Sequence, residues 1–453
     1  MITGLFTPGK MTDLFEKVHE SLPVFKISTS SQMVLYTPGC SIKTEGIPTV
    51  ELRSFFTNPY SIPDQGMRKT VTDIIENARN SLIKWEEKKR AAFRPECLTI
   101  HSGSDCNLHC TYCYAASIKT GNKKLTGFPA SDSIAAAAEY IISKAAMKSK
   151  RMTVAYHGAG EPSCHWDLLT SAFTMLEGIA VSKGIKLFNY IATNGCINEL
   201  QIKWLAEHMD LIGISCDGPP DIHMAQRTTV ASKYPPIETI CKRIHGLGGR
   251  FDIRVTVTRD NYSRMPEITR YLIENCLASN IRIEPVYLGG INAFRVTDAD
   301  LFYDYFVQSA TMAADYGVGF GYSGVRMEEL HSTYCDVSRN TVRLTVDGKS
   351  RNCFCFMDER THFITGGFNK SKRSFSIRPD IDLLKTLAFA IPDECNDCIN
   401  AYHCSRGCPD FCLFENDYHP VSQLDPFRCR LHQKIAAGHA VATAKTLVGA
   451  GSK

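Results

Sequence analysis

Segments with strand character alternate with longer helical segments through the middle of the chain, and this alternation constrains the fold most strongly. Repeated strand–helix units build a parallel sheet that is covered by helices. The expected strands are 98–101, 152–157, 187–192, 211–215, 251–257 and 281–286, and the expected helices are 130–146, 168–181, 198–208, 237–247 and 265–274. Six units predict an α/β fold with a partial (β/α)6 TIM-like barrel, open on one side. In barrels of this type the chemistry lies at the carboxyl ends of the strands.

Three cysteines directly follow the first expected strand, at Cys106, Cys110 and Cys113. Thiolates are soft ligands, and spacings of three and two intervening residues fold them around one small metal centre. A single zinc ion or an ordinary ferredoxin cluster would need a fourth protein ligand nearby, and the local run supplies only three. A 4Fe–4S cluster held by three cysteines keeps one iron available for a cofactor. A structural zinc knuckle is the competing interpretation.

This spacing, with Tyr112 immediately before the last cysteine, resembles the signature of the radical S-adenosylmethionine (radical SAM) superfamily. The resemblance implies that the three thiolates hold a 4Fe–4S cluster. It implies that S-adenosyl-L-methionine (SAM) binds the free iron through its amino and carboxylate groups. It also implies that Tyr112 packs against the adenine, whereas simple packing within the loop is the alternative.

Motifs after the next two strands resemble the SAM-binding elements of the same family. Residues 159–162, Ala-Gly-Glu-Pro, resemble Gly-Gly-Glu-Pro with Ala159 in place of the first glycine. A glycine lets the backbone approach the cofactor closely, and Glu161 would accept a charge-assisted bond from the SAM ammonium group. Residues 193–195, Thr-Asn-Gly, resemble a turn that is common in these enzymes.

The fourth strand ends in Ser215-x-Asp217-Gly-Pro, and Arg227 lies eight residues beyond that proline. This resembles the family's Ser-x-Asp-Gly-Pro, in which the serine and a following arginine contact the ribose hydroxyls and the carboxylate of SAM. We interpret the Asp-Gly-Pro part as a strand-ending turn. The resemblance therefore assigns cofactor contacts to Tyr112, Gly160, Glu161, Asn194, Ser215 and Arg227.

Seven further cysteines lie in the last third of the chain, with Gly348 between the first two. Their spacing resembles the SPASM domain, which carries two auxiliary 4Fe–4S clusters, so the resemblance implies three clusters in all. The outer auxiliary cluster would be bound by Cys395, Cys398, Cys404 and Cys429. The inner one would be bound by Cys335, Cys353 and Cys408. The fourth ligand of the inner cluster is Cys355, Cys412 or absent, and an open iron could bind a substrate thiolate.

The patterns divide the chain into four parts. Residues 1–95 form an α+β N-terminal extension with one long helix from 67 to about 90. We expect this extension to be either a peptide-recognition region or a segment that covers the barrel. The radical SAM partial barrel then occupies 96–315, the SPASM domain 316–435 and a C-terminal tail 436–453.

Composition excludes several classes of function. A formal net charge of +4 over 453 residues gives no support for nucleic-acid binding. No apolar run approaches the ~20 residues needed to span a bilayer, and the first residues lack the basic and apolar regions of a signal peptide. We therefore expect a cytoplasmic protein with no nucleic-acid or membrane partner. Its 19 cysteines are expected to be ligands or buried thiols rather than disulfides.

The resemblance implies an anaerobic enzyme that cleaves SAM to a 5′-deoxyadenosyl radical, which abstracts hydrogen from a peptide or protein side chain. The product would carry an oxidative post-translational modification such as a crosslink, and the family points to a ribosomal precursor peptide as substrate. A reductant such as flavodoxin or ferredoxin would supply electrons. Phe354 stands where sulfatase-maturing relatives have an aspartate base, which counts against formylglycine formation. The sequence identifies no catalytic side chain.

Two other functions stay open at this point. The first is a SPASM-type dehydrogenase of a small alcohol or sugar, which a closed pocket of substrate size would favour. The second is a non-catalytic iron–sulfur or zinc scaffold that binds a partner. Glu284 at the end of the sixth strand is either a substrate contact at the barrel mouth or part of a structural salt bridge.

Overall fold

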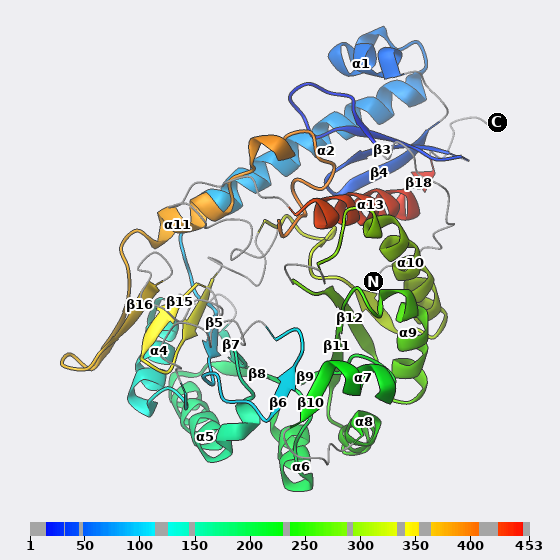
Figure 1. The fold of residues 1–453 in the computed structure, drawn as a ribbon. Helices are drawn as coiled ribbons and strands as arrows, with labels where there is room; N and C mark the ends of the chain where they lie inside the picture. The colour runs from blue at the N-terminus through cyan, green and yellow to red at the C-terminus, as the bar shows by residue number, and fades with distance from the viewer. Residues whose placement is uncertain are drawn as a thin grey trace.

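One eleven-stranded sheet dominates the molecule, with the order β13-β12-β11-β9-β8-β7-β5-β14-β15-β16-β17 (Figure 1). The computed structural model describes residues 15–30, 32–44, 49–113, 126–144, 150–229, 236–287, 293–332, 340–352, 364–406 and 425–446. The strands are β5 (Cys97–Ile100), β7 (Arg151–Tyr156), β8 (Lys186–Thr193), β9 (Leu211–Ser215), β11 (Phe251–Val257), β12 (Asn280–Pro285), β13 (Gly319–Gly321), β14 (Thr341–Leu344), β15 (Lys349–Arg351), β16 (Ile364–Asn369) and β17 (Ser374–Ile377). Neighbours from β13 through to β14 are parallel, and β14 through to β17 are antiparallel.

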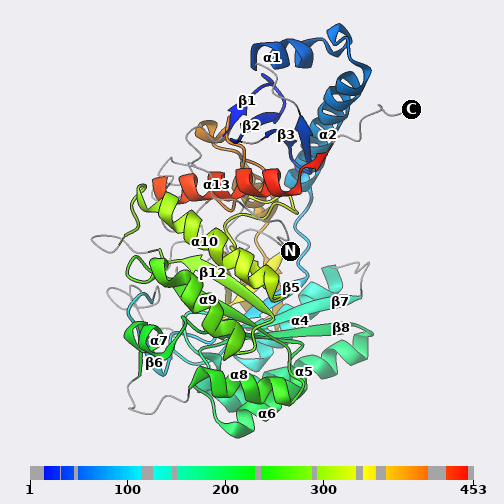
Figure 2. The same cartoon turned by 90° about the vertical axis from the view of Figure 1, so that its right-hand side faces the viewer.

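Helices on the outer face of the curved sheet connect the parallel strands (Figures 1 and 2). They are α4 (Ser131–Lys144), α5 (Trp166–Lys183), α6 (Glu199–His208), α7 (Pro220–Gln226), α8 (Ile237–Gly246), α9 (Met265–Glu274) and α10 (Asp298–Asp315). The predicted α/β class with a partial barrel is confirmed, and each of the six expected strands is present within about two residues of its expected bounds. The sheet also extends beyond the prediction, with β13 at one edge and β14 to β17 at the other.

Local sequence signals explain why these helices begin and end where they do. The Asn198 side chain accepts a bond from the Gln201 backbone, and the Gln201 side chain accepts one from the Asn198 backbone, which forms a capping box at the start of α6. Helix α5 ends at Lys183 and is capped by Gly184, whose φ of 64° is a conformation that glycine adopts without strain.

Alternation along the strands separates a buried face from the barrel interior. On β11 the side chains of Ile253, Val255 and Val257 are buried in the main core beneath the helices. Arg254, between them, is exposed, and its neighbour across the sheet, Arg282 on β12, is exposed too. Because charged side chains at mid-strand reach solvent, the interior of this partial barrel is open rather than filled with apolar side chains.

A second sheet with the order β1-β2-β3-β4-β18 is formed by the N-terminal part and one short strand near the C-terminus. Its strands are β1 (Glu16–Lys17), β2 (Phe25–Ser28), β3 (Met33–Thr37), β4 (Cys40–Thr44) and β18 (Lys445–Thr446). One face packs on α1 (Thr49–Thr57) and α2 (Gln65–Arg90) in a separate apolar core, and the other joins the main core. The long helix expected from 67 to about 90 is present as α2.

Helices attach this second sheet to the rest of the molecule. Helix α13 (Pro426–Thr443) lies between the N-terminal sheet and α10, and it contacts both (Figures 1 and 2). On α2, Trp85 is buried against the rings of Phe389 and Tyr402, beside α11 (Ile381–Ala388). No helix in the described ranges has the length and apolar character needed to cross a bilayer. The four-part division of the chain stays a prediction.

Candidate cofactor and iron–sulfur sites

The three clustered cysteines lie beyond the carboxyl end of β5. Cys106 is in the loop, and Cys110 ends β6 (Leu108–Cys110), a short strand that pairs antiparallel with β10 (Arg227–Thr229). The backbone N–H of Cys113 donates to the Cys110 carbonyl at 3.1 Å. Burial raises the pKa of Cys110 to about 11, and the thiols of Cys113 and Cys106 add to that rise. The three thiols are therefore close enough to repel one another when ionised.

This donor set fits an iron–sulfur cluster better than a single metal ion. Among the residues that the structure describes, no group of three His, Cys, Asp or Glu side chains is close enough to hold one ion. In a 4Fe–4S cluster each thiolate binds a different iron, so the sulfurs stand further apart than around a single ion. Three soft thiolates in one loop, too far apart for a single ion, match a 4Fe–4S cluster.

Asp217 is a fully buried carboxylate that accepts hydrogen bonds from four residues. The Tyr112 hydroxyl donates to its Oδ2 at 2.6 Å, and Arg227 donates through Nε at 2.8 Å and Nη2 at 3.2 Å. The Gln226 amide and the Thr256 backbone N–H, each at 3.0 Å, complete the set. Burial works against ionisation of Asp217, but Arg227 and the other donors outweigh it, and the net pKa is lowered.

This carboxylate ties the cysteine loop to the strand ends. The Arg227 guanidinium lies 5.4 Å from the centre of the Tyr112 ring and is only 8% exposed. Cys110 is its register partner across the β6–β10 ribbon. Tyr112 and Arg227, both predicted to contact the cofactor, are therefore brought together here. Asp217, which we interpreted as part of a turn, is the residue that holds them.

Glu161 and Asn194 meet on the other side of the cysteine loop. The buried Glu161 carboxylate accepts from the Asn194 backbone N–H at 2.7 Å, the Thr193 hydroxyl at 2.9 Å and the Ser163 backbone N–H at 3.1 Å. The Asn194 side-chain amide lies 3.7 Å from the Cys106 sulfur. Burial raises the pKa of Glu161, and these donors oppose the rise. The predicted turn at 193–195 therefore contacts both a proposed cofactor ligand and a proposed cluster ligand.

Gly160 has a steric reason to be glycine that the sequence did not reveal. A Cβ on this residue would lie 2.2 Å from the Asp105 carbonyl oxygen. The neighbouring Glu161 N–H donates to that same oxygen at 2.8 Å. The Asp105 side chain in turn accepts from Gly127 N–H at 2.7 Å and lies 2.9 Å from His165 Nε2. Gly160 thus lets residues 158–161 pack directly on the cysteine loop.

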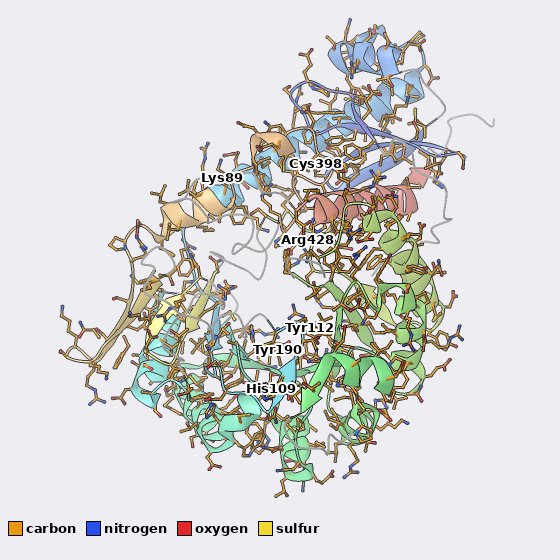
Figure 3. The ribbon with its side chains drawn as sticks, in the orientation of Figure 1. Lys89, His109, Tyr112, Tyr190, Cys398 and Arg428 are labelled. Carbon is orange, nitrogen blue, oxygen red and sulfur yellow. The ribbon has the colours of Figure 1, made fainter. Side chains whose placement is uncertain are left out.

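Ser215 ends β9 and is half-buried beside Arg254, its register partner on β11. A Cβ on Gly213, two residues earlier on the same face, would lie 2.3 Å from the Tyr190 hydroxyl. Tyr190, which is labelled in Figure 3, therefore lies across β9 inside the barrel. Ser215 is consequently on the barrel side of the sheet, at the same strand-end level as Asp217.

Four cysteines of the C-terminal part also converge. Cys395 ends a short 3-10 turn (Asp393–Cys395), Cys398 and Cys404 follow it, and Cys429 is in the first turn of α13. Burial raises the pKa of all four thiols, to about 12 for Cys404, and neighbouring thiols of the set add to the rise for each except Cys398. The structure thus brings together the four residues predicted as ligands of the outer auxiliary cluster.

A buried guanidinium beside these thiols indicates that an anionic group belongs there. Arg406 is 5% exposed, and its Nε and Nη1 have no hydrogen-bond partner in the ranges that the structure describes. Its backbone N–H donates to the Cys404 sulfur at 3.2 Å, and its charge opposes the rise in the pKa of Cys395. A buried charge without a counter-charge is costly, and thiolates around a cluster supply that counter-charge. The donor set and its surroundings therefore fit an iron–sulfur cluster.

The other predicted auxiliary ligands lie outside the described residues. These are Cys335, Cys353 and Cys408, with the candidate fourth ligands Cys355 and Cys412. The inner auxiliary cluster therefore stays a prediction from the sequence. Glu284 is buried and accepts a hydrogen bond from the Ser323 hydroxyl.

Comparison with known proteins identifies the barrel. Residues 100–272 match the model of the radical SAM superfamily. The chain contains a radical SAM domain. This match spans β5 to α9, and with them Cys106, Glu161 and Arg227. The radical SAM family implies SAM and a 4Fe–4S cluster as cofactors.

Curated relatives of the radical SAM domain are cysteine-type anaerobic sulfatase-maturating enzymes. The chain is 26% identical to that of Clostridium perfringens over 177 residues, which are 38% of this chain and 47% of that enzyme. It is 30% identical to that of Clostridium novyi over 167 residues, 36% of this chain and 43% of that enzyme. The chain thus spans about half the length of the curated relatives it matches.

Solved structures share the fold over more of the chain. Native anSMEcpe with bound AdoMet covers 75% of this chain and 96% of its own, with a TM-score of 0.61 and 18% identity. Streptococcus suis SuiB bound to S-adenosylmethionine covers 93% of this chain and 100% of its own, with a TM-score of 0.51 and 13% identity. The second likeness extends beyond the radical SAM domain.

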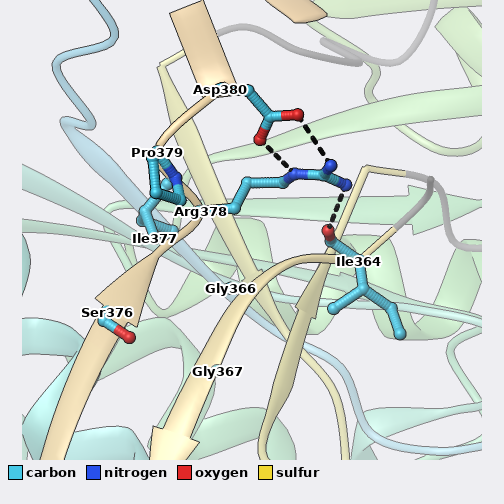
Figure 4. Close-up of a pocket in the computed structure, with 8 residues that line it drawn as sticks. All are labelled: Ile364, Gly366, Gly367, Ser376, Ile377, Arg378, Pro379 and Asp380. Carbon is cyan, nitrogen blue, oxygen red and sulfur yellow. Dashed lines mark hydrogen bonds and ion pairs between the residues drawn. The ribbon is translucent and has the colours of Figure 1, made fainter. Parts of the chain in front are cut away.

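A separate cavity lies on the antiparallel end of the sheet. It has a volume of about 650 Å³ and is lined by β16, β17 and residues 378–380 (Figure 4). Its one cation, Arg378, donates through Nη2 to Asp380 at 2.7 Å and through Nη1 to the Ile364 carbonyl at 3.3 Å. None of the predicted site residues lines it. This cavity therefore gives no support to a small-molecule site in the radical SAM domain.

Proposed function

We propose that this chain is a radical SAM enzyme that oxidatively modifies a side chain of a peptide or protein. The observation that carries the proposal is the placement of Cys106, Cys110 and Cys113 beside the buried Asp217–Arg227 pair, within a matched radical SAM domain. The bound SAM and 4Fe–4S cluster would supply a 5′-deoxyadenosyl radical, which abstracts a hydrogen atom from the substrate.

The residues of the chain would bind and orient these groups. Cys106, Cys110 and Cys113 would hold the catalytic cluster, and the SAM contacts would come from Tyr112, Gly160, Glu161, Asn194, Ser215 and Arg227. Glu161 accepts three hydrogen bonds, two at Oε1 and one at Oε2. A carboxylate has about four acceptor positions, so Glu161 retains capacity for the SAM ammonium group.

The first role of Arg227 would be to hold its neighbours Asp217 and Tyr112 in position. Its Nε and Nη2 both donate to Asp217, which in turn accepts from the Tyr112 hydroxyl. The pair fixes the Tyr112 ring at the edge of the cysteine loop, where the aromatic could support the adenine. A contact between Arg227 and the SAM carboxylate then depends on the guanidinium donors that Asp217 does not use.

A peptide substrate is supported by the relatives and by the shape of the barrel. Solved structures similar to this chain include anSMEcpe with a bound Cp18Cys peptide and SuiB bound to the precursor peptide SuiA. The barrel interior is open enough to expose Arg254 at mid-strand. The N-terminal sheet with α1 and α2, residues 15–90, is then a candidate peptide-recognition region. We propose a ribosomal precursor peptide as substrate, a flavodoxin or ferredoxin as reductant and the cytoplasm as location.

Two auxiliary clusters would complete the electron path. The convergence of Cys395, Cys398, Cys404 and Cys429 around buried Arg406 supports the outer cluster. Reconstituted protein should then contain about twelve iron and twelve sulfide per chain if all three clusters are 4Fe–4S. Phe354 in place of an aspartate favours a modification other than formylglycine.

The test is a coupled measurement on a peptide. The anaerobically reconstituted chain is incubated with SAM, dithionite and a short peptide encoded beside it. We expect the peptide to lose hydrogen in step with formation of 5′-deoxyadenosine, as measured by mass spectrometry and chromatography. Formation of 5′-deoxyadenosine with no change in any neighbouring peptide, but with oxidation of a small alcohol or sugar, would contradict the peptide substrate and support a dehydrogenase.

A further inference from the structure

A continuous chain of buried polar groups runs from Cys404 to the end of barrel strand β12. His432 Nδ1 lies 3.1 Å from the Cys404 sulfur, and its Nε2 lies 2.8 Å from the Tyr322 hydroxyl. Arg428 Nη1 reaches the same hydroxyl at 3.4 Å. Arg428 Nη2 donates to the carbonyls of Pro285 and Val286 at 2.8 Å each. His432, Tyr322 and Arg428 are 1%, 7% and 1% exposed, so water does not compete for these bonds.

The direction of each hydrogen bond in this series follows from the groups at its two ends. Arg428 can only donate, so the Tyr322 oxygen accepts from it and turns its own hydrogen toward His432 Nε2. His432 Nε2 is then an acceptor, which places the ring hydrogen on Nδ1. That hydrogen points at the Cys404 sulfur. The Cys404 sulfur must therefore accept this hydrogen bond. A thiolate that binds iron is a stronger hydrogen-bond acceptor than a thiol.

We infer that His432 donates a hydrogen bond to the Cys404 thiolate and thereby raises the reduction potential of the outer auxiliary cluster, with Tyr322 and Arg428 holding the ring in place. The inference rests on the proposed function in one respect, because it requires that Cys404 binds a cluster. A hydrogen bond to a ligating sulfur withdraws electron density and favours the reduced cluster. His432 is thus a positioning residue rather than a catalytic one.

The same series of hydrogen bonds links the proposed outer cluster to the radical SAM domain. Arg428 precedes the proposed ligand Cys429 on α13, and its guanidinium lies 3.3 Å from the centre of the Tyr287 ring, just after β12. Figure 3 shows Arg428 facing the barrel side of the molecule. Arg428 is also paired with Asp425, whose Oδ2 lies 3.2 Å from its Nε, so it acts by holding the Tyr322 hydroxyl rather than as an unbalanced charge. The three side chains therefore set how readily that cluster accepts an electron.

The test is a redox titration of the full chain, monitored by electron paramagnetic resonance. The catalytic cluster is first removed by replacing Cys106, Cys110 and Cys113 with alanine, so that the auxiliary clusters alone contribute. In this background we expect His432→Leu to shift the midpoint potential of one auxiliary cluster to a more negative value. His432→Asn keeps an N–H near the position of Nδ1 and should restore most of the potential. Tyr322→Phe should give a smaller shift in the same direction as His432→Leu.

A matched control comes from the same helix. His439 lies 3.7 Å from Glu328 and contacts no thiol among the described residues, so His439→Leu should leave both midpoint potentials unchanged. Wild-type potentials in both His432→Leu and Tyr322→Phe would overturn the inference. If His432→Leu fails to assemble the cluster, Tyr322→Phe decides, and a wild-type potential in that variant would overturn the inference.

Failure of the underlying assignment gives a different result. Cys404→Ala should remove about four iron per chain if Cys404 holds a 4Fe–4S cluster. Full iron content in Cys404→Ala would refute the ligand assignment, and the inference would fall with it. Loss of iron in Cys404→Ala together with unchanged potentials in His432→Leu and Tyr322→Phe would refute the inference alone.

Discussion

The Arg227 guanidinium and the Asp217 carboxylate form a buried two-point ion pair, with Nε 2.8 Å from Oδ2 and Nη2 3.2 Å from Oδ1. The pair joins β10 to the end of β9 and holds the Tyr112 hydroxyl at 2.6 Å. The cysteine loop and the strand ends are therefore connected through the Asp217 carboxylate. This arrangement makes Asp217 as important to the site as the residues that would contact SAM.

Asp217→Asn should destabilise the protein markedly. The change leaves the Arg227 charge buried without its partner, which typically costs about 3 kcal/mol or more in the free energy of unfolding. Urea unfolding of the two proteins measures the difference. The exposed pair of Arg264 with Asp221 provides the control, and Asp221→Asn should leave the unfolding midpoint unchanged. Equal stability of Asp217→Asn and the wild type would show that the ion pair does not hold the loop.

Glu161→Gln should weaken SAM binding while the iron content stays the same. The substitution keeps the size of the side chain and removes the negative charge proposed to meet the SAM ammonium group. Loss of a bond to a charged group costs about 1.5–3 kcal/mol, or roughly ten- to a hundred-fold in affinity. Anaerobic calorimetry with SAM tests this. Unchanged affinity would move Glu161 from cofactor binding to a purely structural role.

The long, periodic elements of this fold could be predicted from sequence, whereas its short strands could not. Six strands and the helices between them carry enough apolar residues for their period to show. Strand β13 has three residues and β14 four, and both form only by pairing with strands already in place. The ribbon of β6 with β10 joins residues more than a hundred positions apart, and no local pattern predicts such pairing.

The candidate site divides in the same way. Residues in recognisable motifs, such as Cys106, Glu161 and Arg227, could be named in advance. Asp217 lies inside such a motif, yet its bonds to Tyr112 and Arg227 exist only in the folded chain. His432 had one weak signal, because it follows Cys429 by three positions on a helix and so shares its face. Its contact with Cys404 is a tertiary one.

His101 should make stability depend on pH between about pH 4 and 6.5. Burial, reinforced by the charge of Arg351, lowers its pKa from 6.5 to about 4, so the folded state keeps the ring neutral where the unfolded chain protonates it. The unfolded state then binds more protons in this window, and stability falls as pH falls. The contribution of neutral His101 to the free energy of unfolding is fully present above pH 6.5. About 3 kcal/mol of it is lost by pH 4.

His101→Gln provides the comparison, because glutamine does not titrate in this range. The difference in unfolding free energy between wild type and variant, followed by urea unfolding from pH 7 to pH 5, should shrink steadily toward lower pH. A difference that is independent of pH would contradict the buried neutral state of His101.

Gly160→Ala should disrupt the cysteine loop. The added Cβ would lie 2.2 Å from the Asp105 carbonyl oxygen, so the backbone of one of the two segments must move. We expect lower iron retention after reconstitution and weaker SAM binding. Gly178→Ala on α5 is the matched control, because its Cβ would meet no atom within 4 Å and helix propensity should raise stability by up to about 1 kcal/mol. Normal iron content in Gly160→Ala would refute this role for the glycine.

The most direct test of the account is whether SAM cleavage depends on the three clustered thiols. Anaerobically reconstituted wild-type chain, the variant with alanine at Cys106, Cys110 and Cys113, and Cys40→Ala as a control are each incubated with SAM and dithionite. The account predicts 5′-deoxyadenosine from the wild type and from Cys40→Ala, and none from the triple variant, which should also lose about four iron per chain. Equal 5′-deoxyadenosine from the triple variant and the wild type would contradict it.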